Sequence, residues 1–189
     1  MSVQPAAVKP STDDALLVVR VGKGDLEALG LLFDRYEETV ARFLKRMSIP
    51  GSDIDDLVQT TFLQVLRAAR RFEPDISVRG WLLGIASMMA RRHRRSLGRL
   101  AKRIRTWATI PRTPQPTPDD ALTQRHAGLR LQRALAALPP KKREAFVLVT
   151  LEGMSGEEAA EALGVPINTI WTRLHHARRE LRERIGEDQ

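Results

Sequence analysis

The segment 154–182 restricts the possible folds more than any other part of the chain, because its residues predict two helices joined by a tight turn. Ser155 can cap the first helix, and the acidic residues that follow it suit the positive end of a helix dipole. Gly164 favours the left-handed backbone that ends a helix, and Pro166 prevents one continuous helix through the turn. The second helix is expected to cover residues 167–185. The pattern is therefore that of a helix-turn-helix.

The second helix of this motif has an apolar face and a polar face flanked by arginines. Its apolar residues recur at helical spacing: Ile170, Leu174, Ala177, Leu181 and Ile185. A polar face on the second helix of a helix-turn-helix suits contact with base edges in the major groove of DNA. The candidate DNA contacts are Asn168, Thr169, Trp171, Thr172, Arg173, His175, His176 and Arg178. A helical hairpin with a solvated basic face is the alternative interpretation.

Composition and periodicity predict an all-α protein made of two small helical domains. Aromatic residues make up 5% of the 189 residues, and alanine and leucine are abundant. No segment has the alternating pattern of a strand. Residues 107–118 contain four prolines, which predicts an extended, semi-rigid linker. The expected organisation is a disordered N-terminus at 1–12, a first domain at 13–106, this linker, and a second domain at 119–189.

Helix periodicity and capping residues divide the two domains further. Helices of the first domain are expected at 13–22, 25–46, 52–72 and 81–105. Ser52 is expected to cap the third of these, whose first turn is rich in aspartate. The segment 72–80 is expected to be a loop, because its proline and glycine sustain neither a helical nor a strand period. Helices at 121–138 and 141–153 are expected before the helix-turn-helix.

The formal net charge of +8 is concentrated in one part of the chain. No aspartate or glutamate occurs between Gly80 and Pro118, and the helix expected at 81–105 turns strongly basic after an apolar start. A dense run of unpaired basic residues repels itself without an anionic partner, so we expect this helix to contact nucleic-acid phosphates. A basic cap at a helix end is the alternative.

No motif in the chain predicts catalysis. There is no cysteine, which excludes disulfides and cysteine-based metal sites or nucleophiles. The adjacent residues His175 and His176 project about 100° apart on a helix, so they cannot share a metal as an i, i+4 pair does. No glycine-rich phosphate loop or GxSxG motif occurs, and helix starts explain the carboxylate pairs at 55–56 and 157–158. We therefore expect no enzyme activity, metal or cofactor.

The first residues lack the apolar core of a secretory signal, and no apolar stretch is long enough to cross a membrane. Together with the absence of cysteine, this favours a cytoplasmic protein without membrane insertion.

Four stretches, in this order, resemble bacterial RNA polymerase sigma factors of the extracytoplasmic-function (ECF) type. They are DIDDLVQTTFLQVLRAARRF at 53–72, RGWLLGIASMMARRHRR at 79–95, LPPKKRE at 138–144 and the helix-turn-helix. The resemblance implies that the first domain docks on the β′ clamp helices and recognises and opens the minus-10 promoter element. It implies that the second domain reads the minus-35 element. Core RNA polymerase (β′ clamp helices and β flap), promoter DNA and an anti-sigma factor are the implied partners.

The resemblance also implies roles for individual residues. The polymerase-docking positions are Asp55, Asp56, Leu57, Gln59 and Thr60. The positions for minus-10 recognition and melting are Phe72, Asp75, Ile76, Ser77, Val78, Arg79 and Trp81, with Arg91, Arg92, Arg94 and Arg95 as phosphate contacts. Trp171 departs from the family, in which this position is often basic, so the location of the recognition helix is predicted but not the bases that it reads.

Two other classes of protein share parts of this pattern. One is a stand-alone helix-turn-helix regulator with an N-terminal dimerisation or sensing domain, and the other is a helical adaptor protein. The acidic entry DIDDLVQ and the basic helix behind Trp81 favour the sigma factor, because a dimerisation domain needs neither feature.

Overall fold

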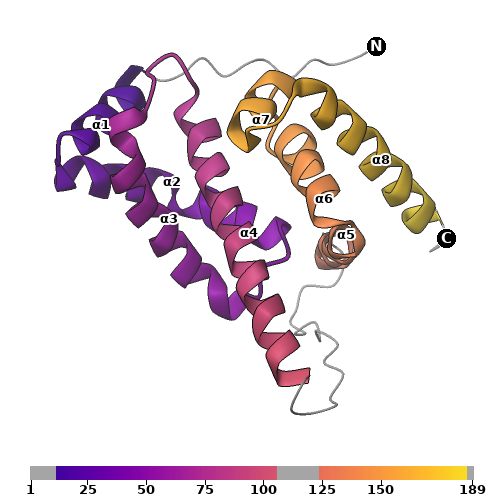
Figure 1. Ribbon diagram of the computed structural model, residues 1–189. Coiled ribbons are helices and arrows are strands. Elements are labelled where there is room, and N and C mark those ends of the chain that lie inside the picture. Colours follow the sequence, from indigo (N-terminus) through magenta and orange to yellow (C-terminus); the bar gives the residue numbers. More distant parts are fainter. Residues whose placement is uncertain (1–11, 106–123, 187–189) are drawn as a thin grey trace.

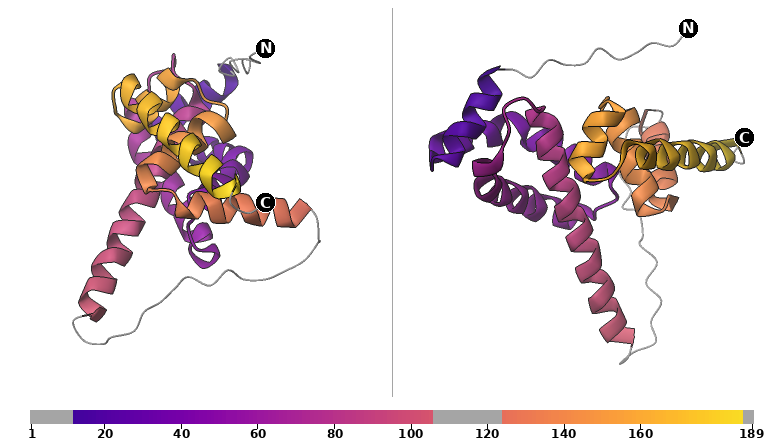
Figure 2. Two further views of the ribbon diagram at one scale, coloured as in Figure 1. Left: turned by 90° about the vertical axis from the view of Figure 1, so that its right-hand side faces the viewer. Right: turned by 45° about the horizontal axis from the view of Figure 1, so that its top comes forward.

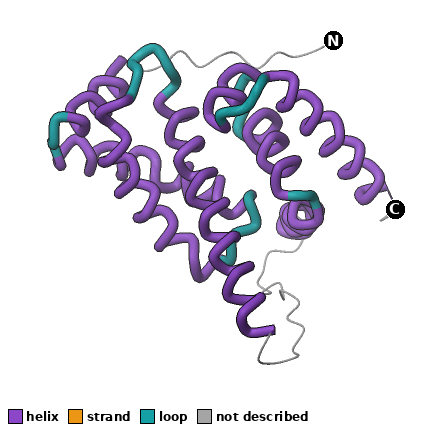
Figure 3. Tube along the Cα trace, viewed as in Figure 1, coloured by secondary structure: helices purple, strands orange, loops and turns teal. Residues whose placement is uncertain are grey.

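The computed structural model describes residues 12–105 and 124–186 (Figure 1). The predicted linker 107–118 and the predicted disordered N-terminus, apart from Thr12, lie outside the described residues. Every regular element of the described residues is a helix, which confirms the all-α prediction (Figure 3). The elements are α1 (Thr12–Gly22), α2 (Leu26–Arg46), η1 (Gly51–Asp53), α3 (Ile54–Ala68), η2 (Ala69–Arg71), α4 (Val78–Arg105), α5 (Gln124–Ala137), α6 (Pro140–Phe146), η3 (Val147–Leu151), α7 (Gly156–Leu163) and α8 (Ile167–Gly186).

Helices α1 to α4 form the first unit, in which α2 packs against α1, α3 and α4. Asp25 caps α2, since its carboxylate accepts the Ala28 N–H at 3.1 Å. The buried face of α2 follows the helical period and consists of Ala28, Leu32, Val40, Phe43 and Leu44. This face supports α3 and α4, the two helices that carry the predicted polymerase and minus-10 residues.

The predicted cap of the third helix is wrong. The Ser52 hydroxyl lies 2.8 Å from the Asp53 carboxylate and makes no capping hydrogen bond to α3. The short helix η1 occupies this stretch, so α3 begins two residues after Ser52. The expected aspartates still lie in the first turn of α3, where the helix dipole favours negative charge.

Helix α4 begins at Val78 instead of Trp81, so Val78 and Arg79 are helical residues and not loop residues. The Ser77 hydroxyl accepts the Gly80 N–H at 3.2 Å, as a residue that caps the start of a helix does. This local hydrogen bond outweighs the weak helix propensity of the glycine, which is why the expected boundary was three residues late.

Helices α7 and α8 form the predicted helix-turn-helix. The Ser155 hydroxyl accepts the Glu158 N–H at 3.1 Å, and the Glu158 carboxylate accepts the Ser155 N–H at 2.8 Å, which completes a capping box. Gly164 ends α7 with a left-handed φ of 63°, as predicted. The described part of the expected apolar face of α8 is buried: Ile170, Leu174, Ala177 and Leu181.

The two helical units pack against each other through α4 and α7 (Figure 1). Buried residues of both units belong to one continuous apolar cluster. The last turns of α4 extend away from both units, as the two views of Figure 2 show. The predicted recognition helix α8 lies on the side of the second unit remote from α1 to α4.

Candidate nucleic-acid and polymerase interfaces

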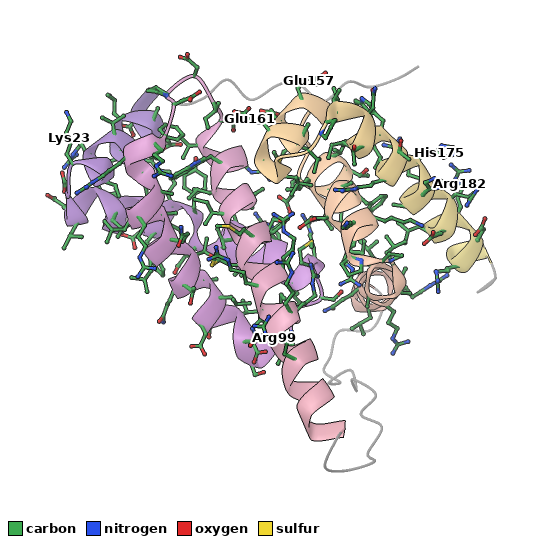
Figure 4. All side chains as sticks on the ribbon, in the orientation of Figure 1. Lys23, Arg99, Glu157, Glu161, His175 and Arg182 are labelled. Carbon is green, nitrogen blue, oxygen red and sulfur yellow. The ribbon has the colours of Figure 1, made fainter. Side chains whose placement is uncertain are left out.

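The predicted recognition face of α8 is open to solvent. Asn168, Thr172, His175 and Arg178 are exposed, whereas Thr169, Arg173 and His176 are half-buried. Figure 4 shows His175 and Arg182 on the outer side of α8. The helix therefore presents hydroxyl, amide, imidazole and guanidinium groups on one accessible face, the groups that contact base edges and phosphates.

Trp171 combines an exposed position with a close neighbour on α7. Its side chain is 46% exposed. A β-carbon added to Gly156 would come within 2.3 Å of Cζ2 of the indole ring, so the ring rests against the glycine backbone. The first turn of α7 thus positions an aromatic plane on the recognition face, where it can contact the methyl group of thymine.

The basic half of α4 contains two kinds of arginine. Arg92, Arg95 and Arg99 are exposed, so their guanidinium groups are available to an anion. Arg91 and Arg94 are half-buried, and each contacts another group of the protein. Arg91 Nη1 lies 3.4 Å from the Glu144 carboxylate.

Burial changes the electrostatics of Arg94. Its Nη1 donates to the main-chain carbonyl of Met47 at 3.1 Å. Burial lowers the pKa of the Arg94 guanidinium, with a smaller opposing effect from the charge of Glu144. Arg94 therefore has a structural partner in this arrangement, which the sequence did not indicate.

The predicted minus-10 residues lie around the start of α4. Phe72 and Val78 are buried, Ile76, Ser77 and Trp81 are half-buried, and Asp75 is exposed. The rings of Phe72 and Trp81 meet edge to face with centroids 5.0 Å apart. Phe72 and Val78 therefore belong to the core beneath this region, whereas Asp75, Ile76, Ser77 and Trp81 border accessible space.

A cavity of about 460 Å³ lies between this region and α7. Its first wall includes Glu73, Ile76, Ser77, Trp81 and Arg91. Its second wall includes Glu158, Glu161 and Ala162 of α7, and Figure 4 shows Glu161 on the side of α7 toward α4. Helix α7 thus covers part of the predicted minus-10 surface.

The predicted docking residues of α3 border a groove of about 420 Å³ against α2. Asp55 and Gln59 line it, Asp56 and Thr60 are exposed beside it, and Leu57 is buried in the core. The remaining lining residues are Phe33, Glu37, Glu38, Ala41 and Val58. The groove has an apolar floor and an acidic rim.

Sequence reasoning missed two sets of residues. The contribution of Glu37 and Glu38 from α2 to the groove has no local sequence signal, because the groove forms only when α2 and α3 pack. Glu144 and Glu152, whose side chains are 1% exposed, were also missed. The sequence features that mark them are their places in the chain: Glu144 ends the stretch LPPKKRE, and Glu152 directly precedes Gly153.

Residues 12–105 and 124–186 contain no group of three or more acidic or histidine side chains suited to hold a metal ion. No helix within these residues is long and apolar enough to span a membrane.

Two family models match the chain: Sigma-70 region 2 over residues 32–100 and Sigma-70 region 4 over residues 128–181. RNA polymerase sigma factor CarQ of Myxococcus xanthus is 37% identical over 171 residues, which cover 89% of this chain and 95% of CarQ. The chain belongs to the ECF RNA polymerase sigma factors. ECF RNA polymerase sigma factor SigE of Mycolicibacterium smegmatis is 31% identical, with 95% of this chain and 71% of SigE covered.

A solved structure of RNA polymerase sigma factor CnrH has the same fold. The structure of CnrH in complex with the cytosolic domain of CnrY is similar with a TM-score of 0.69 and 28% identity, over 93% of this chain and 99% of CnrH. As a sigma factor, the protein binds core RNA polymerase, directs it to specific promoters and helps to melt the minus-10 element. Sigma factors are initiation factors without catalytic activity, so the predicted function and the absence of enzyme activity are confirmed.

Proposed function

We propose that the two helical units divide promoter recognition between them. Residues 13–106 dock on polymerase and open the minus-10 element, and residues 119–189 read the minus-35 element, with 107–118 as the linker. The observation that carries this division is the separation of two nucleic-acid surfaces, the basic face of α4 and the exposed face of α8, on different units. The two family models match within these two ranges and support the division.

In the first unit, we assign base capture to the segment before α4 and to Trp81. Asp75, Ile76 and Ser77 border the cavity region or solvent and can meet an unpaired base, whereas Phe72 and Val78 hold this segment from below. The phosphate contacts are assigned to the arginines of α4 and its first turn: Arg79, Arg91, Arg92, Arg94 and Arg95. Their density in a stretch without acids supports this role.

In the second unit, we assign base contacts to Trp171, Thr172, His175 and His176, because these side chains share the open face of α8. Asn168 and Thr169 at the start of α8 and Arg173 and Arg178 along its sides are assigned to the DNA backbone. Helix N-termini and arginines at the edges of a recognition helix are usual phosphate contacts.

The polymerase contact is assigned to Asp55, Asp56, Gln59 and Thr60, with Leu57 as their buried support. The groove against α2 supports this, since an apolar floor with an acidic rim suits a partner helix with apolar and basic side chains. The β′ clamp helices are the proposed partner there, and the β flap is the proposed partner of the second unit.

We further propose that an anti-sigma factor controls the protein and that it acts in the cytoplasm. The support for the first point is the similarity to CnrH, which was solved in complex with the cytosolic domain of CnrY.

The test is initiation by purified core RNA polymerase with this chain on promoter fragments in which the two elements are varied separately. Substitutions of Asp75 or Ile76 are expected to change the response to minus-10 variants only, and substitutions of His175 or His176 the response to minus-35 variants only. Equal loss on all fragments would contradict the assigned base contacts. DNA binding by the chain without initiation would contradict the polymerase contacts.

A further inference from the structure

We propose that the two helical units hold each other closed through buried glutamates that occupy the arginines of the minus-10 surface in place of DNA phosphates. The closed arrangement is the contact of α6, η3 and α7 with α2 and α4. It is a self-inhibited form of the free chain, and promoter DNA opens it by competing for the same arginines. The proposal rests on the phosphate role assigned above to Arg79 and Arg91.

Glu152, which follows η3, forms the first contact. Its carboxylate pairs with Arg46 of α2 at 2.6 Å and with Arg79 of α4. Arg79 also donates to the Glu152 main-chain carbonyl at 2.6 Å, and Arg46 donates to the Leu151 carbonyl at 3.2 Å. The Glu152 side chain is 1% exposed, whereas both arginines remain about one-third exposed. A single acid of the second unit thus binds two cations of the first.

Glu144 of α6 forms the second contact, further along α4. Its carboxylate accepts from the Ser87 hydroxyl and lies 3.4 Å from Arg91. The Glu144 side chain is 1% exposed. Glu144 and Glu152 therefore engage arginines at two separate positions of α4, as two phosphates of a nucleic-acid strand would.

The Met47 carbonyl forms a third contact between the units, because it accepts from Arg143 at 2.8 Å. It also accepts from Arg94 of its own unit at 3.1 Å. Arg143 belongs to α6, so the end of α2 is fastened to the second unit. Burial, with the nearby charge of Arg94, lowers the pKa of Arg143 to about 10, and the guanidinium stays protonated at neutral pH.

Shape complements these charges. At Gly84 an added β-carbon would come within 2.7 Å of the Ala162 carbonyl oxygen, so α4 and α7 touch through their backbones. One turn earlier, a β-carbon on Gly80 would lie 3.2 Å from Cε of Met154, which is buried. Helix α7 is therefore seated on α4 directly beside Trp81 and the cavity that borders the minus-10 residues.

The chemistry of the contact makes it reversible. Removing carboxylates and guanidinium groups from water costs free energy that their pairing only offsets, so such pairs specify an arrangement more than they stabilise it. A phosphate offers an arginine the same bidentate geometry as a carboxylate. A DNA strand can thus replace Glu144 and Glu152 without leaving an arginine unpaired.

The test measures closure and DNA affinity in the full chain. Spin labels on Lys23→Cys and Arg182→Cys report the distance between the units, because both residues are exposed and lie at opposite ends of the molecule (Figure 4). The free chain is expected to give one narrow distance distribution, which broadens when duplex DNA of mixed sequence is added. A broad distribution in the free chain overturns the proposal.

Two independent variants open the contact. Glu144→Gln with Glu152→Gln removes the carboxylate charges, and Gly84→Ala keeps every charge but clashes with α7. Alanine is also the better helix former, so Gly84→Ala leaves α4 intact and carries the test if the double variant fails to fold. The control for charge is Glu27→Gln with Glu157→Gln, two exposed residues that form no ion pair with another described residue.

Both opening variants are expected to broaden the distance distribution. The glutamate double variant is expected to bind duplex DNA at least about fivefold more tightly than the charge control, and Gly84→Ala at least about fivefold more tightly than the wild type, because closure lowers the fraction of molecules that can bind DNA. Unchanged distances, or an affinity that follows formal charge alone, overturn the proposal. Arg79→Ala in the Gly84→Ala background tests the phosphate role of Arg79 separately from closure of the two units. If the salt dependence of binding stays the same there, the DNA role of Arg79 and the competition are both wrong, while the distances still report closure.

Discussion

The indole ring of Trp171 rests on the backbone of Gly156, so α8, the proposed recognition helix, depends on a residue of the preceding helix for the position of its largest side chain. A β-carbon on Gly156 would come within 2.3 Å of the ring. Gly156 is the first residue of α7 and its backbone is not in the left-handed region. Glycine is therefore required at this position for space and not for backbone conformation.

Gly156→Ala is expected to displace the indole ring and to weaken binding to duplex DNA with the minus-35 element by about 1–2 kcal/mol, the scale of one base contact. The ring is half-exposed and can move away from the new methyl group, so the thermal midpoint should change little. The measurement is DNA affinity by fluorescence anisotropy with a melting curve of each variant.

Gly128→Ala is the matched control, because nothing lies within 4 Å of a β-carbon at this position of α5. It should leave DNA affinity unchanged and raise stability slightly, since alanine favours a helix. Equal DNA affinity of Gly156→Ala and the wild type would show that the ring position does not matter for recognition.

Arg92→Ala with Arg95→Ala is expected to weaken DNA binding on all sequences and to lower the slope of log affinity against log salt by about 2, one for each lost phosphate contact. Both side chains are exposed, so stability should be unchanged. A change in the preference between promoters would contradict a phosphate role.

Arg94→Ala is expected to differ from these two substitutions by an additional loss of stability. Its guanidinium donates to the buried Met47 carbonyl, which would keep only its bond from Arg143. The expected loss of stability is about 1–3 kcal/mol, measured by urea unfolding. A stability equal to that of the wild type would show that the hydrogen bond to Met47 contributes nothing.

Local signals predicted the helix-turn-helix well. The capping box at Ser155 and the left-handed turn at Gly164 depend on residues within a few positions of each other, so the sequence contains all the information that they need. The all-α class followed for the same reason, because helical periodicity is local. The start of α4 was missed, since Gly80 suggested a loop and the cap by Ser77 was not recognised.

The contacts between the two units could not be read from the sequence. Arg46 and Glu152 are 106 positions apart, and Ser87 and Glu144 are 57 apart, with no periodicity that connects them. The arginines of the helix expected at 81–105 were predicted as unpaired because no acid occurs nearby in the chain, yet Arg91 pairs with Glu144 of the other unit. The acidic groove between α2 and α3 likewise needs two helices to be packed before it exists.

Asp55→Arg is expected to raise the dissociation constant for core RNA polymerase at least about tenfold, equivalent to about 1.4 kcal/mol. The substitution places a bulky cation on the acidic rim of the groove that is proposed to receive a clamp helix. The measurement is binding of labelled chain to core polymerase without DNA. Glu27→Arg, an equal charge change on an exposed residue that does not line the groove, should bind as the wild type does. Equal weakening by both variants would indicate a general charge effect.

Asp25→Asn tests the cap of α2 through its dependence on pH. The Ala28 N–H and, to a smaller extent, the Arg20 guanidinium hold the pKa of the Asp25 carboxyl below its usual value of 3.8. Because the folded state binds the proton less readily than the unfolded state, this carboxylate stabilises the fold fully above pH 3.8. The stabilisation is lost as the pH falls through the lowered pKa. Asparagine keeps a capping oxygen but has no charge to titrate.

The difference in urea-unfolding free energy between wild type and Asp25→Asn should therefore be largest near neutral pH and shrink steadily below pH 3.8. Asp34→Asn is the control, since Asp34 is exposed on the same helix and pairs with no other described residue. It should show no comparable pH-dependent difference from the wild type. A difference for Asp25→Asn that stays constant with pH would assign the stabilisation to the capping hydrogen bond alone and remove the charge from the account.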